Sequence, residues 1–257
     1  MRDDQGHHCR VSDEQIRHLP FAGALNFRDI GGYPVAGGSM TRWRAVYRSD
    51  SLHYLNRADL AIFDALGVTA VYDLRRPAEI ARFPGPRDHV CLEIPSGDLA
   101  NWAVGSLQTR RNGEEWLAAD YASMLAGAAQ VFGSLFARLA ENAGLPAVVH
   151  CLAGKDRTGM AIALLLAALG VDRGTVLDDY ELTSRCHASR VPEVVDIFAR
   201  LGIGRPAAHA LMSTPRWTMA QALEELDENY GGIEDYLLGP GDISPQTLNA
   251  LRANLTA

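Results

Sequence analysis

Short apolar runs alternate with amphipathic stretches along most of the chain. Val68–Leu74 is β-branched and apolar, and Ala147–His150 is a second short run of the same kind, so both are predicted to be buried strands. Arg44–Tyr47 and Val90–Ile94 are weaker strand candidates. Strands that alternate with helices predict an α/β domain with one central sheet flanked by helices.

Helices are predicted from the spacing of apolar residues and from their end signals. Asn56 is a suitable N-cap for a helix through Leu66 that ends at Gly67. Phe21–Pro34, which is rich in glycine, predicts a loop or a short hairpin. The other predicted helices are Glu114–Glu141 (one helix, or two broken at Gly127 or Gly133), Thr158–Leu169 closed by Gly170, Arg173–Arg190, Val191–Leu201 and Thr214–Tyr230, with short helices to the end. This helical tail is expected either to pack over the sheet or to cover the site.

Composition narrows the class of protein. The 257 residues suffice for one domain, predicted to span residues 20–257 behind a polar segment at residues 1–19. Apolar residues make up 47% and charged residues 21%, a balance typical of a globular protein. The net charge of -7 argues against a nucleic-acid partner, because binding a phosphate backbone needs an excess of Lys and Arg. An anionic substrate would therefore need a locally positive site.

The cysteines and the amino-terminal residues predict the compartment. The four cysteines are widely spaced and include no CxxC pair, which favours free thiols over a disulfide framework or a zinc site. No metal and no cofactor is expected. Met1–Arg17 is polar, and the most apolar run, Met160–Val171, is too short to span a bilayer, so no transmembrane segment is expected. The prediction is a cytoplasmic protein, with export as an effector without a cleaved signal as the alternative.

The segment HCLAGKDRTG, residues 150–159, carries the chemistry. A buried strand leads into it and a helix follows it, and its core is Cys151, five residues, Arg157 and the hydroxyl of Thr158. Backbone N–H groups converge in such a turn, and the helix dipole adds positive charge there, so the segment predicts a site for phosphate or another oxyanion. Arg157 would close over the phosphate with a bidentate fork. The predicted phosphate-binding residues are Leu152, Ala153, Gly154, Lys155 and Arg157.

Cys151 is the predicted nucleophile. The positive field that binds phosphate also favours the thiolate form, which is the reactive one. Thr158 is expected to donate a hydrogen bond to the sulfur, and His150 to brace the loop through its ring nitrogens.

Three other kinds of loop place a cysteine or a glycine-rich turn before a helix or bury a cysteine. A nucleotide-binding Walker loop is excluded, because the positions that need glycine and Ser or Thr hold Val149 and Asp156. A sulfur-transfer loop would also place a cysteine before a helix, but it would not need Arg157 and Thr158 in this arrangement. A buried structural cysteine is the third alternative.

The segment resembles the protein tyrosine phosphatase signature, and more narrowly the HCxAGKDRTG form found in a family of bacterial tyrosine and lipid phosphatases (tyrosine phosphatase family 3). The matching segments span roughly residues 20–255 and are NFRDIGG at 26–32, YRSD at 47–50, VYDLR at 71–75 with Glu79, Asp178-Asp179-Tyr180, and Tyr230-Gly231-Gly232 with Tyr236-Leu237. The resemblance implies a tyrosine phosphatase-like fold with a helical C-terminal extension. It also implies a metal-free, two-step reaction through a phosphocysteine.

The leaving group of such a reaction needs a proton from a general acid. The family carries an aspartate inside the phosphate loop, and Asp156 occupies that position. Asp98, in the loop after Val90–Ile94, is the rival acid. Asp73, at a strand end, is a second rival, but it is rather expected to orient Arg157 or another group of the loop.

Three arginines are assigned supporting roles. Arg28 and Asp29 are expected to form a structural ion pair. Only the resemblance suggests that Arg48 and Arg75 help to hold the loop or the substrate.

Lys155 bears on the substrate. A second cation in the loop suits a ligand with several phosphates, whereas the alternative is a lysine that merely offsets Asp156. The family includes enzymes that act on phosphotyrosine, phosphoserine or phosphothreonine, and phosphoinositides, so a phosphorylated protein or a phosphoinositide is the expected substrate. A phosphate-binding module without catalysis is the alternative function.

Overall fold

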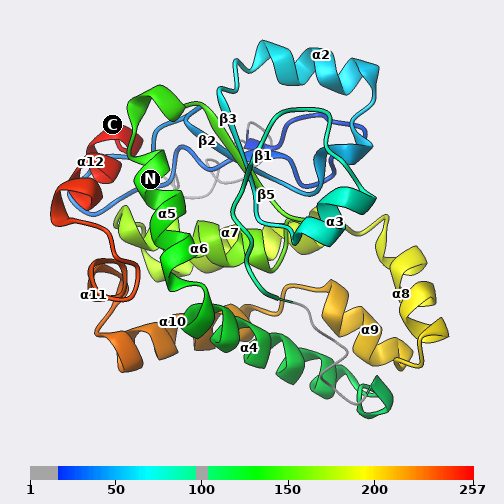
Figure 1. The fold of residues 1–257 in the computed structure, drawn as a ribbon. Coiled ribbons are helices and arrows are strands. Elements are labelled where there is room, and N and C mark those ends of the chain that lie inside the picture. Colours follow the sequence, from blue (N-terminus) through cyan, green and yellow to red (C-terminus); the bar gives the residue numbers. More distant parts are fainter. Residues whose placement is uncertain (1–16, 97–103) are drawn as a thin grey trace, which may run out of the picture.

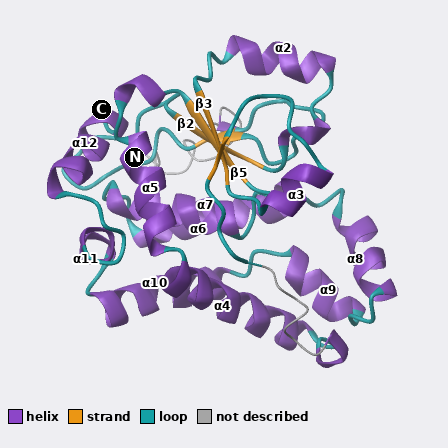
Figure 2. Ribbon diagram, in the orientation of Figure 1, coloured by secondary structure: helices purple, strands orange, loops and turns teal. Residues whose placement is uncertain are grey.

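The computed structural model describes residues 17–96 and 104–257, in which helices surround a central sheet (Figures 1 and 2). The strands are β1 (Arg28–Asp29), β2 (Val46–Ser49), β3 (Ala70–Asp73), β4 (Val90–Cys91) and β5 (Ala147–His150). The α-helices are α2 (Arg57–Ala65), α3 (Pro77–Arg82), α4 (Arg110–Gly127), α5 (Ala129–Leu139), α6 (Arg157–Ala168), α7 (Arg173–Cys186), α8 (Val191–Arg200), α9 (Arg205–Met212), α10 (Arg216–Tyr230), α11 (Ile233–Leu238) and α12 (Pro245–Leu255). The predicted α/β class is confirmed.

The order of the sheet brings three strand ends together. The strands lie in the order β1-β2-β5-β3-β4, with β2, β5, β3 and β4 parallel and β1 antiparallel to β2. His150, at the end of β5, pairs in register with Ser49 of β2 and Asp73 of β3. Because parallel strands end at the same edge, the segment after His150 emerges at the carboxyl edge of the sheet, where α/β proteins bind ligands.

The alternation of side chains along the strands divides the core in two. Val148 of β5 packs with Phe27 and Phe63 on the face covered by α2, whereas Val149 packs in the larger cluster on the opposite face. That larger cluster includes most of α6, which is buried almost all round. The segment between β5 and α6 is therefore anchored at both ends by buried elements.

Two predicted features of the helices are confirmed with their physical cause. The side chain of Asn56 accepts from the N–H groups of Ala58 and Asp59 at the start of α2, and Asp59 completes the capping box. The long predicted helix divides after Gly127 into α4 and α5. Gly133 stays inside α5, because its missing side chain makes room for the carbonyl of Gly241, which would lie 1.8 Å from a Cβ.

Three short elements were not predicted. β1 spans two residues, and α3 begins with Pro77 at its first turn. α9 was missed because Gly204 and Pro206 resemble helix breakers. Proline is tolerated in the first turn of a helix, where its missing N–H would have no partner in the helix, and Pro206 lies there.

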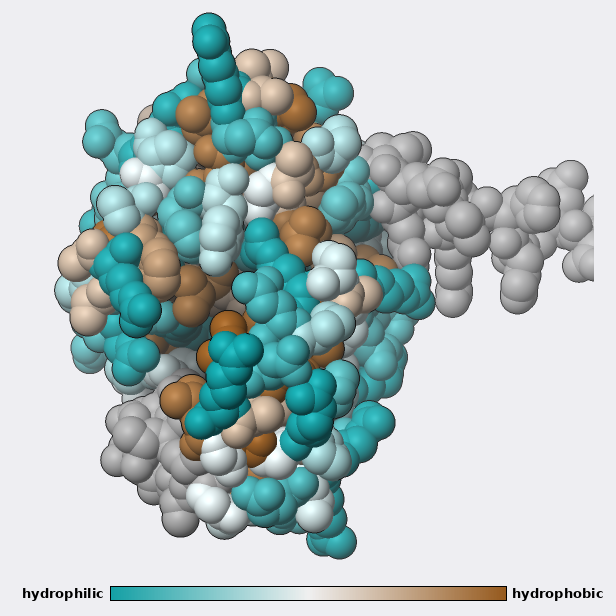
Figure 3. All heavy atoms as spheres, turned by 90° about the vertical axis from the view of Figure 1, so that its right-hand side faces the viewer, coloured by the Kyte–Doolittle hydropathy of each residue, from teal (hydrophilic) through white to brown (hydrophobic). Residues whose placement is uncertain are grey.

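The helical tail packs over the helices that cover the sheet. α10 contacts α4 and α7, α11 contacts α5 and α6, and α12 contacts α5. α8 and α9 lie on the other side of the molecule from α11 and α12 (Figure 1), where Ile197 of α8 (46%) and Leu201, which follows α8, (63%) are exposed. Seen from that side, hydrophobic side chains are interspersed with hydrophilic ones (Figure 3). Within the described residues no single helix is both long and apolar enough to cross a membrane, and only the pair α4 and α5, bent by 70°, meets that measure together.

Candidate active site

Residues 151–156 form the loop between β5 and α6, and Gly154 fixes its path. Gly154 has a φ of +62°, and a Cβ there would lie 2.3 Å from the carbonyl oxygen of Ser49 and 2.6 Å from the nitrogen of Asp50. Only glycine combines this backbone conformation with such a close approach. The loop is thus pressed against the end of β2.

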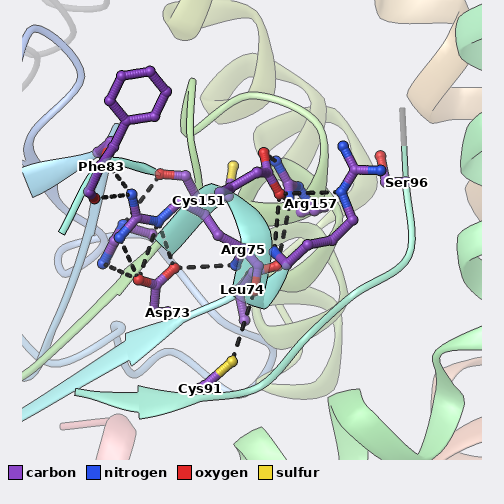
Figure 4. Close-up of polar contacts among 12 residues, drawn as sticks. Asp73, Leu74, Arg75, Phe83, Cys91, Ser96, Cys151 and Arg157 are labelled. Carbon is purple, nitrogen blue, oxygen red and sulfur yellow. Dashed lines mark hydrogen bonds and ion pairs between the residues drawn. The ribbon is translucent and has the colours of Figure 1, made fainter. Parts of the chain in front are cut away.

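Cys151 lies at the floor of this loop. The residue is 2% exposed, and its sulfur accepts the N–H of Gly154 at 3.2 Å. Leu152 (38% exposed), Ala153 and Asp156 keep contact with solvent, so the loop opens on their side. In Figure 4, Arg157 lies on one side of Cys151 and the pair of Asp73 and Arg75 on the other.

Arg157 is held by a carboxylate from α3. Its guanidinium donates to both oxygens of Glu79, at 2.7 and 2.9 Å, and to the carbonyl of Leu74 at 3.4 Å. Burial by itself raises the pKa of Glu79, but the hydrogen bonds and charge of Arg157 outweigh it and lower that pKa from 4.5 to about 2. Glu79 therefore fixes the direction of the guanidinium of Arg157.

Glu79→Gln is expected to lower the free energy of unfolding by about 3 kcal/mol at pH 7, because it removes the counter-charge of the largely buried guanidinium of Arg157. The pKa in the folded state is the lower one, so this contribution is complete above about pH 5 and is lost as the pH falls toward 2. Urea unfolding at pH 7, 5 and 3 measures it. Glu115→Gln, at an exposed ion pair with Arg111, is the control. Parallel pH curves for wild type and Glu79→Gln would contradict the assignment.

Asp73, Arg75 and His150 support the loop from beneath. Asp73 forms a short ion pair with Arg75 (2.6 Å) and lies 3.6 Å from Nε2 of His150. The other ring nitrogen of His150 lies 3.1 Å from the carbonyl oxygen of Cys151, and burial lowers the pKa of this histidine. Asp73 thus contacts His150, another group of the loop and one of the two partners expected for it, and the described structure shows no ion pair between Asp73 and Arg157. The guanidinium of Arg75 also donates to Ser51 and to the carbonyl of Phe83.

A buried ion cluster holds the loop at Gly154. The carbonyl of Gly154 accepts from Arg48 at 2.8 Å and from the amide of Asn26 at 2.9 Å. Arg48 and Arg28 both pair with Asp179 of α7, at 2.5 and 3.1 Å, with all three side chains at most 1% exposed. Burial raises the pKa of Asp179, but the two guanidinium groups outweigh it and hold that pKa below its ordinary value. The supporting role expected of Arg48 therefore has a structural basis.

The predicted ion pair between Arg28 and Asp29 is wrong. Arg28 pairs with Asp179, whereas Asp29 accepts from the backbone N–H groups of Gly31 and Arg44. The two neighbours on β1 point to opposite faces of the sheet, so adjacent residues there cannot face each other.

Lys155 and Asp156 pair with each other. Lys155 is 3% exposed, and its ammonium group lies 2.5 Å from Oδ1 of Asp156. The phenol of Tyr121 donates to the same oxygen at 2.8 Å. The geometry favours the simpler of the two interpretations of Lys155, in which it offsets Asp156.

Two predicted site residues, Thr158 and Asp98, are not confirmed by the structure. The hydroxyl of Thr158 is buried and has no hydrogen-bond partner among the described residues, so the expected bond to the sulfur is absent. Asp98 lies outside the described residues. The choice between Asp98 and Asp156 therefore stays a prediction.

Several residues that hold the loop, directly or through an arginine, were not assigned such a role from the sequence. Asn26, Glu79 and Asp179 all belong to segments that match the family, so the resemblance gave a signal for them. His187, at the end of α7, bonds the carbonyl oxygen of Ala153 through Nε2 at 2.6 Å, and no motif marked it. Among the described residues no group of three or more His, Cys, Asp or Glu is arranged to hold a metal ion.

Comparison with known proteins agrees with this geometry. The sequence profile of the tyrosine phosphatase family matches residues 19–257. The chain belongs to the tyrosine phosphatase family. It is therefore an enzyme of the phosphatase class, and its fold is the tyrosine phosphatase-like fold expected from the resemblance.

Individual relatives support the same conclusion. The chain is 32% identical over 238 residues to a Cupriavidus necator protein whose name assigns it to the tyrosine-protein phosphatases, covering 87% of this chain and 84% of the relative. It is 29% identical over 287 residues to the triple specificity protein phosphatase PtpB of Mycobacterium tuberculosis, covering 93% and 99%. It is also 29% identical over 220 residues to a tyrosine-protein phosphatase of Nostoc commune, covering 82% and 74%.

Proposed function

We propose that this phosphatase hydrolyses phosphate monoesters through a cysteinyl-phosphate on Cys151. The observation that carries the proposal is the sulfur at the floor of the loop, bonded to the N–H of Gly154, with Arg157 held beside it by Glu79. The helix α6 begins at Arg157 and adds the positive end of its dipole. An oxyanion in the loop would meet these groups together.

The reaction proceeds in two displacements. The thiolate of Cys151 attacks phosphorus, the ester P–O bond breaks, and the leaving oxygen takes a proton from Asp156. Water then attacks the phosphorus of the S–P bond and gives a proton back to Asp156, which releases inorganic phosphate and restores the thiolate. Arg157 and the backbone N–H groups stabilise the equatorial oxygens, the kind of electrostatic placement that supplies most of the acceleration in phosphoryl transfer.

The substrates we propose are phosphotyrosine proteins, with phosphoserine, phosphothreonine and phosphoinositides as further substrates. The name of the mycobacterial relative, a triple specificity phosphatase, supports more than one class. The pairing of Lys155 with Asp156 leaves recognition of a second phosphate to other groups.

A panel of phosphopeptides and phosphoinositides assayed side by side tests which of these substrates the enzyme hydrolyses. Phosphatase activity is tested by turnover of an aryl phosphate at pH 5–7 and by its inhibition with vanadate. If the folded protein binds phosphate but shows no such turnover, the non-catalytic binding module is favoured.

Asp156→Asn is expected to lower the kcat for alkyl phosphates by roughly 10²–10³-fold, because a poor leaving group depends on its proton. Activated aryl phosphates should lose much less. Steady-state kinetics across substrates of graded leaving-group pKa measure this dependence. Asp98→Asn is the matched variant, and a steeper leaving-group dependence in Asp98→Asn than in Asp156→Asn would reassign the acid to Asp98.

A further inference from the structure

A tyrosine from a distant helix holds Asp156. Tyr121 lies on α4, 35 residues before Asp156 in the sequence, and is fully buried. Its hydroxyl donates to Oδ1 of Asp156 at 2.8 Å, and the ammonium group of Lys155 contacts the same oxygen at 2.5 Å. In the described part of the chain, no donor reaches Oδ2. Within the described residues, Oδ1 of Asp156 thus accepts from two donors, whereas Oδ2 accepts from none.

The hydroxyl of Tyr121 is itself oriented by a chain of hydroxyl groups. It lies 2.6 Å from the hydroxyl of Tyr180 on α7, which lies 3.3 Å from Oγ1 of Thr218 on α10. The proton of Thr218 goes to the carbonyl of Pro215 at 2.7 Å. Thr218 is then an acceptor toward Tyr180, so the single proton of Tyr180 goes either to Thr218 or to Tyr121. The shorter contact, 2.6 Å against 3.3 Å, favours Tyr121, whose own proton goes to Asp156. Burial first, and then the charge of Asp156, raise the pKa of Tyr121, so its phenol stays a donor.

We infer that Tyr121 is a positioning residue that fixes which oxygen of Asp156 carries the proton. The inference rests on the proposed function, in which Asp156 is the general acid. Oδ1 already accepts from two donors, so a proton added to the carboxyl group binds Oδ2. The terminal torsion of an aspartate has a broad energy minimum, so the bond from Tyr121 also limits rotation that would exchange the two oxygens. A proton held at one defined atom is what transfer to a leaving oxygen requires.

Tyr121→Phe is expected to lower the kcat for alkyl phosphates roughly tenfold, the effect of a loosened catalytic geometry, with KM nearly unchanged. Activated aryl phosphates, whose leaving groups depart without a proton, should be hydrolysed at close to the wild-type rate. The measurement is kcat and KM across leaving groups of graded pKa. An equal loss on all substrates would show a structural role and overturn the inference.

Tyr236→Phe is the matched control. Tyr236 is also fully buried, and its hydroxyl donates to the carbonyl of Leu125 on the same helix α4 at 2.8 Å. Its loss should lower the melting temperature about as much as Tyr121→Phe does. The leaving-group dependence of Tyr236→Phe should match that of the wild type.

A double-mutant cycle tests the positioning role of Tyr121 separately from the proposed role of Asp156 as the general acid. In an Asp156→Asn background no acid remains to be oriented, so adding Tyr121→Phe should cause no further loss on alkyl phosphates. A full tenfold loss in that background would show that Tyr121 acts elsewhere. Asp156→Asn alone tests the acid: if it does not steepen the leaving-group dependence, the assignment of Asp156 fails, and the inference with it. If it does and Tyr121→Phe does not, the inference alone fails.

Discussion

Cys151→Ser should reduce the turnover of an aryl phosphate by roughly 10⁴-fold or more while the loop still binds phosphate. The alcohol that replaces the thiol is not ionised at neutral pH, and no base among the described residues contacts it. The groups that would bind the oxyanion stay in place, since Arg157 is held by Glu79 and Gly154 by Arg48 and Asn26. Steady-state kinetics and calorimetric titration with inorganic phosphate measure the two properties separately.

Cys91→Ser is the control for this substitution. Cys91 ends β4, is exposed, and its thiol donates a long hydrogen bond to the carbonyl of Arg75 at 3.7 Å. Its replacement should leave turnover within about twofold of the wild type, as for most surface substitutions. Substantial turnover by folded Cys151→Ser would rule out the phosphocysteine. Loss of phosphate binding in the same variant would place the oxyanion away from the loop.

Asp179→Asn should destabilise the protein by about 3–5 kcal/mol, because it leaves Arg28 and Arg48 buried without a counter-charge. The same change should weaken phosphate binding, since Arg48 also holds the carbonyl of Gly154. Tyr33, whose hydroxyl donates to Asp179 at 2.9 Å, loses its ionised acceptor as well. Urea unfolding and phosphate titration of the variant measure both effects.

The neighbouring residue provides the matched control. Asp178 has a side chain that is 63% exposed and pairs with Arg216, itself 40% exposed. Asp178→Asn should change the free energy of unfolding by less than about 1 kcal/mol, as surface ion pairs do. Equal destabilisation by Asp178→Asn and Asp179→Asn would show that the buried ion cluster stabilises the protein no more than a surface ion pair does.

The local structure of the site followed from the sequence because its signals are close together in the chain. Ala147–His150 is apolar enough to be a buried strand, and the glycine and charged residues after it break the strand before α6 begins. Asn56 capped its helix as predicted, because an N-cap needs only the N–H groups two and three residues ahead. The residues that match the family extended the prediction to the whole fold.

The sequence did not predict which residue each buried charge pairs with. The sequence suggested Asp29 for Arg28, and it suggested Asp73 for Arg157 or another group of the loop. The structure pairs Arg28 with Asp179, 151 residues away, and Arg157 with Glu79, 78 residues away. Such pairs depend on which helix packs against which strand end.

The sequence by itself therefore determined the strand–loop–helix structure around Cys151 and the α/β class, because a strand, a glycine turn and a helix start are encoded by consecutive residues. Only the tertiary structure decided that Glu79 orients Arg157, that Asp179 ties two arginines to Gly154, and that Tyr121 reaches Asp156 from α4. The physical reason is that a buried charge or hydroxyl needs a partner within about 3 Å. That partner belongs to a segment distant in the sequence, and no local sequence pattern indicates which segment it is.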